Sequence, residues 1–293
     1  MIRASRTRVL LLAIGLLLVA TPLAAICEDS PADLDELIAQ ANAAYLSRHV
    51  LEDMNEALAL YEAVLANLEM LPVQSQAYIL GRASQLCYEA ATFTDGNTPE
   101  DKALFTKGKE YAFRALRLNE AFTANEWAGL ETALTHATAD DAMAMHWLAN
   151  NWGMLLEMNP VQGLMEQGSV MALFERTVEV DEGFWGSSAK SGLGSLLIMV
   201  PGIMGGNMER GLVLVEESIV DAPEYLHNRI ILAEYWGFTY NMFGAVTGVR
   251  DADLIERECA AITAGEIADW PFWNRMAKSE AARLLVLLAE RID

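Results

Sequence analysis

The sequence contains few sets of residues whose types and spacing would support catalysis. Its four histidines, at positions 49, 136, 146 and 227, are too far apart for the i, i+4 pairing that a helical metal site requires. It has no Gly-x-Ser-x-Gly nucleophile elbow, and no histidine is evident as a partner for Cys87, so a buried core cysteine is the simpler interpretation of that residue. We therefore expect a protein that has no catalytic residues, no metal and no cofactor.

Aromatic and polar side chains are better candidates for a binding site. Seven tryptophans are many for a helical protein of 293 residues, and small-molecule pockets are mostly apolar with a few polar groups. Packing between helices would explain the same tryptophans, and Asn151 is a further candidate for a polar lining residue. The predicted ligand-binding residues are His146, Trp147, Asn150, Trp152, Trp185, Met199, Pro201 and Tyr235.

Residues 196–207 form an apolar segment that is interrupted by Pro201 and by three glycines. A phosphate-binding loop would need a Gly-Lys-Ser/Thr sequence after a strand, and neither is present in the sequence pattern. We expect this segment to form a buried hairpin that lines a pocket or makes an oligomer contact.

The elements that must position these residues are helices. Ser30-Pro31 and Thr98-Pro99 each resemble the N-cap and first residue of a helix, with an acidic residue in the first turn. Apolar residues recur at i, i+3, i+4 and i+7 in both of the helices that we expect near the N-terminus, at residues 34–41 and 51–65. No alternation typical of strands is evident from Ser30 onward, so the pattern predicts an all-α protein.

Four segments, at residues 61–67, 112–120, 174–182 and 215–223, share one helix signature. Small and bulky residues in and just before them follow the spacing of the second helix of a TPR unit, most clearly at Gly211, Val215, Ser218 and Pro223. The repeats are spaced by more than the 34 residues of a plain TPR. We therefore expect a TPR-like helical-repeat solenoid of about four degenerate helix pairs, with inserted loops and additional C-terminal helices.

The N-terminus indicates export. Three arginines precede an apolar run from Val9 to Ala20, and small residues near Ala25 provide a cleavage site, so residues 1–27 are predicted to be a signal peptide and 28–293 a single domain. Cys27 stands where a lipoprotein cysteine would stand, although Ile26 fits that peptidase poorly, so both lipidation and simple cleavage are open. Cys87 and Cys259 would remain in the mature chain, and the sequence does not decide whether they pair.

The formal charge of −21 comes from 41 acidic and 20 basic residues. Such a surface argues against nucleic acid as a partner. Solubility is the simplest explanation of the charge, with repulsion of anionic membranes or attraction of a basic partner as alternatives.

The segments around residues 146–153, 174–186, 193–206 and 233–235 together resemble the TatT family, the T-component of TPR-associated TRAP transporters. The resemblance extends over roughly residues 40–285. It implies an exported, trimeric protein with a channel or cleft in each subunit. It also implies cooperation with a periplasmic substrate-binding P-component in the transport of a small hydrophobic or carboxylate ligand, and membrane anchoring where a lipoprotein signal is present.

Two functions therefore compete. The first is a periplasmic accessory of a TRAP-type transporter that binds or channels a small ligand. The second is a periplasmic TPR scaffold that binds a peptide or protein on its concave face.

Overall fold

The computed structural model describes residues 31–94, 97–241 and 244–292. The predicted signal peptide, its cleavage site and Cys27 lie outside the described residues. None of the helices in the described ranges is both long enough and apolar enough to cross a bilayer.

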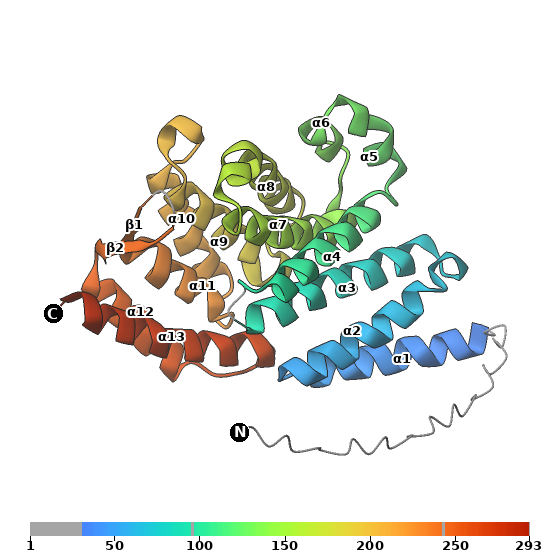
Figure 1. Cartoon of the computed structure of the whole chain (residues 1–293), viewed down its shortest axis with the longest axis horizontal. Coiled ribbons are helices and arrows are strands. Elements are labelled where there is room, and N and C mark those ends of the chain that lie inside the picture. Colours follow the sequence, from blue (N-terminus) through green and yellow to red (C-terminus); the bar gives the residue numbers. More distant parts are fainter. Residues whose placement is uncertain (1–30, 95–96, 242–243, 293) are drawn as a thin grey trace, which may run out of the picture.

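Eight long helices pack as four successive pairs (Figure 1). The pairs are α1 (Pro31–Ser47) with α2 (Leu51–Leu65), α3 (Val73–Phe93) with α4 (Pro99–Leu116), α7 (Ala142–Glu157) with α8 (Pro160–Val180), and α9 (Phe184–Met199) with α10 (Met208–Asp221). The four segments that share a helix signature begin in the second helix of each pair, and Val64, Ala115, Thr177 and Ser218 are all buried there. The predicted all-α fold of helix pairs is thus confirmed.

Polar residues cap the starts of three of these helices, and the start predicted at Thr98-Pro99 is confirmed. Thr98 and Asp101 form a reciprocal capping box at the start of α4, where Pro99 fits because its missing N–H would have no partner in any case. Asn159 and Asn207 accept backbone hydrogen bonds at the starts of α8 and α10. Each polar cap satisfies an N–H group that the first helical turn leaves unpaired.

Glycine permits the closest approach within a pair. A Cβ atom on Gly211 would lie 2.6 Å from the carbonyl oxygen of Gly194, and one on Gly194 would lie 2.7 Å from that of Gly211. Helices α9 and α10 therefore pack backbone against backbone, as the small residues of the repeat signature require.

An insertion separates the second pair from the third. It contains α5 (Glu120–Asn125), η2 (Glu126–Ala128), α6 (Leu130–Leu134) and η3 (Ala139–Asp141), and a shorter turn, η1 (Leu68–Met70), joins α2 to α3. The insertion projects from one edge of the molecule (Figure 1). It explains why the second and third repeats are so far apart in the sequence.

The C-terminal segment returns to the beginning of the chain. It contains α11 (His227–Ile231), the π-helical segment η5 (Leu232–Trp236), strands β1 (Phe238–Tyr240) and β2 (Val246–Val249), α12 (Ala252–Ala264) and α13 (Pro271–Ile292). At the start of α13, Trp273 Nε1 donates to Glu89 Oε1 of α3 at 3.1 Å, and Phe272 packs in a cluster with Met54 of α2. The arc of helix pairs is thereby closed on itself (Figure 1).

The strands correct the prediction that no strand follows Ser30. They pair antiparallel, with an irregularity between Thr239 and Tyr240, and Gly244 adopts φ 79° in the connection. The strands are three and four residues long, which is too short for alternation of polar and apolar residues to be recognised in the sequence.

Cys87 and Cys259 are both buried and free. Each belongs to a different hydrophobic cluster, the first in the helix-pair core and the second between α12, α13 and η5. Their pairing, which the sequence left open, does not occur in this structure.

Candidate functional site

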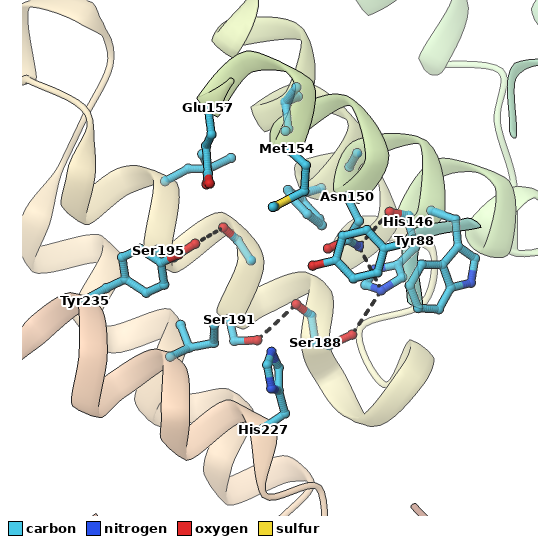
Figure 2. A pocket seen from close by; sticks show the side chains of 18 of the residues that line it. Tyr88, His146, Asn150, Met154, Glu157, Ser188, Ser191, Ser195, His227 and Tyr235 are labelled. Carbon is cyan, nitrogen blue, oxygen red and sulfur yellow. Dashed lines mark hydrogen bonds between the residues drawn. The ribbon is translucent and has the colours of Figure 1, made fainter. Parts of the chain in front are cut away.

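A cavity of about 110 Å³ lies inside the closed arc. Most of its wall comes from α7 and α9, the first helices of the third and fourth pairs, with further residues from α3, α8, α11, η5 and α13 (Figure 2). The lining residues are Tyr88, His146, Trp147, Ala149, Asn150, Gly153, Met154, Glu157, Val170, Phe174, Ser188, Ser191, Gly192, Ser195, Leu196, Tyr225, His227, Ile231, Tyr235 and Trp273. An apolar cavity of roughly 150 Å³ accommodates benzene, so this space fits a small organic molecule.

A polar stripe on α7 forms one wall. His146, Asn150 and Glu157 are spaced by four and seven residues, which places them on one face of a helix that is otherwise largely apolar. All three point toward the same space in Figure 2.

The hydrogen bonds of His146 fix its protonation. Asn150 Nδ2 lies 3.1 Å from His146 Nε2 and can only donate, so Nε2 must be the unprotonated nitrogen. Ser188 Oγ, at 3.2 Å from the same nitrogen, therefore donates to it as well. Burial lowers the pKa of His146 to about 3, which agrees with a neutral ring whose proton is on Nδ1.

Three serines on α9 face the α7 stripe (Figure 2). Ser191 Oγ lies 3.0 Å from the Ser188 carbonyl oxygen and 2.9 Å from Asn228 Oδ1, and Ser195 Oγ donates to the Gly192 carbonyl at 2.8 Å. Spacings of three and four residues put the serines in a row along one face. Their hydroxyl protons are directed to protein acceptors, and their oxygen lone pairs remain for a ligand.

A strained turn at the start of α9 sets the position of the three serines. Trp185, Gly186 and Ser187 all adopt left-handed backbone angles at the start of α9, with φ of 51°, 64° and 55°. A left-handed conformation costs about 1–2 kcal/mol for a residue that is not glycine. The Gly186 carbonyl accepts a hydrogen bond from Asn228 Nδ2 at 2.9 Å, which helps to hold the turn. Strained backbone of this kind concentrates at functional sites.

The C-terminal segment supplies the opposite wall. His227 lies at the start of α11, and Tyr235 projects from the π-helical segment η5, a type of helix that is often found at functional sites. Burial lowers the pKa of His227 to about 4, so this ring is also neutral near pH 7. Aromatic rings close the remaining sides, with Trp273 lying 6.3 Å from Trp147 and 6.2 Å from Tyr88 between ring centroids.

Glu157 is the one carboxylate among the described lining residues. The residue as a whole is exposed at the end of α7, but its carboxyl group points toward the cavity (Figure 2), and burial of that group together with the charge of Glu234 raises the pKa of Glu157 to about 7. Glu157 is also the last residue of α7, where the helix end carries partial negative charge. The carboxyl group is therefore about half protonated near pH 7, and a cation beside it would favour the ionised form.

The structure brings four of the predicted ligand-binding residues together at the cavity: His146, Trp147, Asn150 and Tyr235. The other four do not line it. Trp152 packs against Phe113 with its Nε1 donating to Glu166, and Trp185 packs behind Trp147. Asn151 also points elsewhere, because its Nδ2 donates to the Ser84 backbone.

Met199 and Pro201 lie at the connection between α9 and α10. The prediction of a buried hairpin over residues 196–207 is wrong for its tip: Pro201 is exposed and Ile203 is 98% exposed. Leu196 to Met199 instead complete α9, and Leu196 alone from this segment lines the cavity. The apolar composition reflects the end of a buried helix followed by a glycine-containing turn.

Several lining residues were missed from the sequence. The serine row on α9 and the stripe that extends to Glu157 on α7 were both visible as polar residues at helical spacing in apolar helices. Tyr225, His227 and Trp273 carry no comparable local signal, because only the closure of the arc brings them to the cavity. Tyr88 reaches it through the packing of α3 against α7, which no local pattern records either. The described residues contain no cluster of three or more potential metal ligands.

Paired helices that close around a small cavity define a helical-repeat protein with an internal cavity. The family model of the TRAP transporter T-component matches residues 75–236, from α3 to η5. This match covers more than half of the chain and nearly all of the cavity lining. The chain belongs to the TRAP transporter T-component family. No curated protein matches it.

Proposed function

We propose that this T-component holds a small ligand in the cavity between α7, α9 and η5 and exchanges it with a periplasmic P-component. The cavity carries the proposal, because it combines aromatic walls with a few placed polar groups. Two buried ring nitrogens, Nδ1 of His146 and Nδ1 of His227, have no hydrogen-bond partner in the described protein. Such groups are rare unless a ligand or water satisfies them.

The closed arc favours a small ligand over a peptide. The first helices α3, α7 and α9 would form the open concave face of a repeat scaffold, but α11, η5 and the start of α13 cover this face. A peptide groove would need this segment to move away, which would expose Phe272 and Trp273. The alternative function, a scaffold for a peptide or protein, therefore has less support.

The polar groups support binding and not catalysis. His146 accepts two hydrogen bonds at Nε2, so it offers no free basic nitrogen to a substrate there. Its low pKa leaves it a poor general base at neutral pH. We propose that the protein is a transport accessory without enzymatic activity, exported to the periplasm and anchored there if Cys27 is lipidated.

Native mass spectrometry of the gently purified protein tests the ligand. We expect a bound small molecule that is lost in Ser195→Leu, because the larger side chain fills the cavity. The matched control is Ser279→Leu at an exposed position of α13, which we expect to keep the ligand. An unchanged ligand load in Ser195→Leu would place the ligand elsewhere.

Binding to the P-component needs a separate test. We expect a P-component gene to lie beside the gene of this protein, and the purified protein to bind that P-component in biolayer interferometry. We also expect size-exclusion chromatography with light scattering to give a trimer. Capture of peptides with no affinity for a P-component would instead favour the scaffold. Mass spectrometry of the mature N-terminus would decide whether Cys27 is lipidated.

A further inference from the structure

The hydrogen-bonding character of the cavity restricts its ligand. Both amide protons of Asn150 are used inside the protein, on His146 Nε2 at 3.1 Å and on the His146 carbonyl at 2.8 Å. Its Oδ1 therefore remains as an acceptor. Figure 2 shows this side chain at the cavity.

The serine hydroxyls, like Asn150, are available to a ligand mainly as hydrogen-bond acceptors. Ser188 donates to His146, Ser195 donates to a backbone carbonyl, and Ser191 has two protein acceptors for its single proton. The Oδ1 atom of Asn228 can only accept, because the amide nitrogen donates to the Gly186 and Ser218 carbonyls, so the Ser191 proton goes either to this oxygen or to the Ser188 carbonyl. Each serine thus presents lone pairs to a ligand and has no proton to give.

The charge of the lining residues also favours a cationic ligand. None of the described residues that line the cavity is a lysine or an arginine, and the two histidines of the lining are neutral near pH 7. Glu157 is the lining carboxylate, and the chain as a whole carries −21. The field of such a protein attracts cations and repels anions.

The aromatic walls complete the arrangement. The rings of Tyr88, Trp147, Tyr225 and Trp273 lie within 6.3 Å of a neighbouring ring of this group, and all four line the cavity. Aromatic faces stabilise an ammonium group, most strongly where water is excluded. Tyr88, Tyr235 and neutral His227 each offer both donor and acceptor capacity, so they discriminate little between ligands. Two lining residues have an unpaired donor, His146 at Nδ1–H and Trp147 at Nε1–H, and each would take a water or an acceptor atom of the ligand.

We infer that the cavity selects a small molecule with a protonated amine and a short apolar tail, with the ammonium group directed to Glu157 and the acceptor row of α7 and α9. This inference rests on the proposed ligand-binding function and names its substrate class. It departs from the carboxylate ligand that the sequence left open, because a carboxylate would meet Glu157 with no cation among the described lining residues.

Three probes of equal shape test the selectivity. Isopentylammonium, isopentanol and 3-methylbutanoate carry a cation, a neutral hydroxyl and an anion on the same branched tail. They are titrated by calorimetry into the full protein at pH 8, where Glu157 is ionised. We expect isopentylammonium to bind with a dissociation constant of about 0.1–1 mM, at least about tenfold tighter than the alcohol, and the carboxylate not to bind.

Two variants connect selectivity to the site. Glu157→Gln keeps the shape of the side chain and removes its charge, so the preference for ammonium over alcohol should fall by about tenfold while the alcohol still binds. The control, Glu216→Gln on the exposed face of α10, should leave both affinities unchanged. Circular dichroism establishes that both variants are folded.

The outcomes separate the two proposals. Equal or tighter binding of the alcohol or the carboxylate overturns the inference about ligand class and leaves the ligand-binding function standing. Ammonium binding that survives both Glu157→Gln and Ser195→Leu also overturns it, because the cation would then bind outside the cavity. Absence of ammonium binding at about 10 mM overturns the inference too, and the function itself is then judged by the co-purified ligand.

Discussion

Replacement of Glu157 by glutamine should change how the stability of the protein depends on pH. Burial and Glu234 raise the pKa of Glu157 from 4.5 to about 7 in the folded protein. Between these two values the folded state holds a proton that the unfolded state has released, so the free energy of unfolding falls as pH rises through this range. Below about pH 4.5 and above about pH 7 the contribution is constant.

The magnitude follows from the shift. If the carboxyl group had no access to water, the free energy of unfolding would fall by about 3 kcal/mol over this range, at about 1.4 kcal/mol per pKa unit. Glu157 is an exposed residue at the end of α7, where solvent screens its charge, so we expect about half of that value, or about 1–2 kcal/mol. Glutamine has no charge to bury and should not show the loss.

Urea unfolding at pH 5 and pH 8 measures the effect. The stability of Glu157→Gln relative to wild type should rise by about 1–2 kcal/mol from pH 5 to pH 8. Taking this difference removes the contribution of general charge repulsion, and Glu216→Gln controls for the loss of one acidic residue. A change within about 0.3 kcal/mol for Glu157→Gln would refute the reasoning, because the carboxylate would then be as well solvated as one on the surface.

Further predictions concern the backbone and the thiols. Gly186→Ala should lower the free energy of unfolding by about 2 kcal/mol or more, because the position is left-handed and an added Cβ would lie 2.8 Å from an aromatic ring. Gly168→Ala in helix α8, where nothing lies within 4 Å, should instead raise it by about 0.5–1 kcal/mol in the same urea titration. Gly211→Ala should cost about 1–3 kcal/mol and separate α9 from α10, and an equal stability to wild type would argue against the close packing. Cys87 and Cys259 are free and buried, and burial raises both pKa values, so a thiol reagent should label these two residues only after unfolding, as located by peptide mass spectrometry.

The helix pairs could be predicted because their signals are local. Caps, prolines and the small-bulky-small spacing of residues such as Gly211 and Val215 act within one or two turns, and the family resemblance agrees with the match over residues 75–236. The lengths of the insertions did not obscure these signals. The small β-hairpin was missed because its strands are too short to show a period.

The site was harder to predict, for two physical reasons. Helix α7 is buried around most of its circumference, so periodicity does not show which face meets a cavity and which meets a neighbouring helix. This is why Trp152 was taken for a lining residue although it faces α4. The other reason is that His227 and Trp273 reach the cavity through long-range closure, which no local pattern encodes.

The left-handed turn at residues 185–187 is a further case. Only Gly186 signals such a conformation in the sequence, while Trp185 and Ser187 are residue types that avoid it. The turn sets the direction of α9 and hence the place of Ser188, Ser191 and Ser195 at the cavity. Strain that is compensated by tertiary contacts, here with Asn228 and Tyr225, is not recorded in local sequence preferences.

The most direct test of the central claim is a crystal structure of the protein purified without denaturation from its own cells. The account predicts electron density for a small molecule between Glu157 and the serine row of α9, with a donor group within hydrogen-bonding distance of the Glu157 carboxylate. A cavity that holds only ordered water, with a ligand or partner bound elsewhere on the surface, would contradict it.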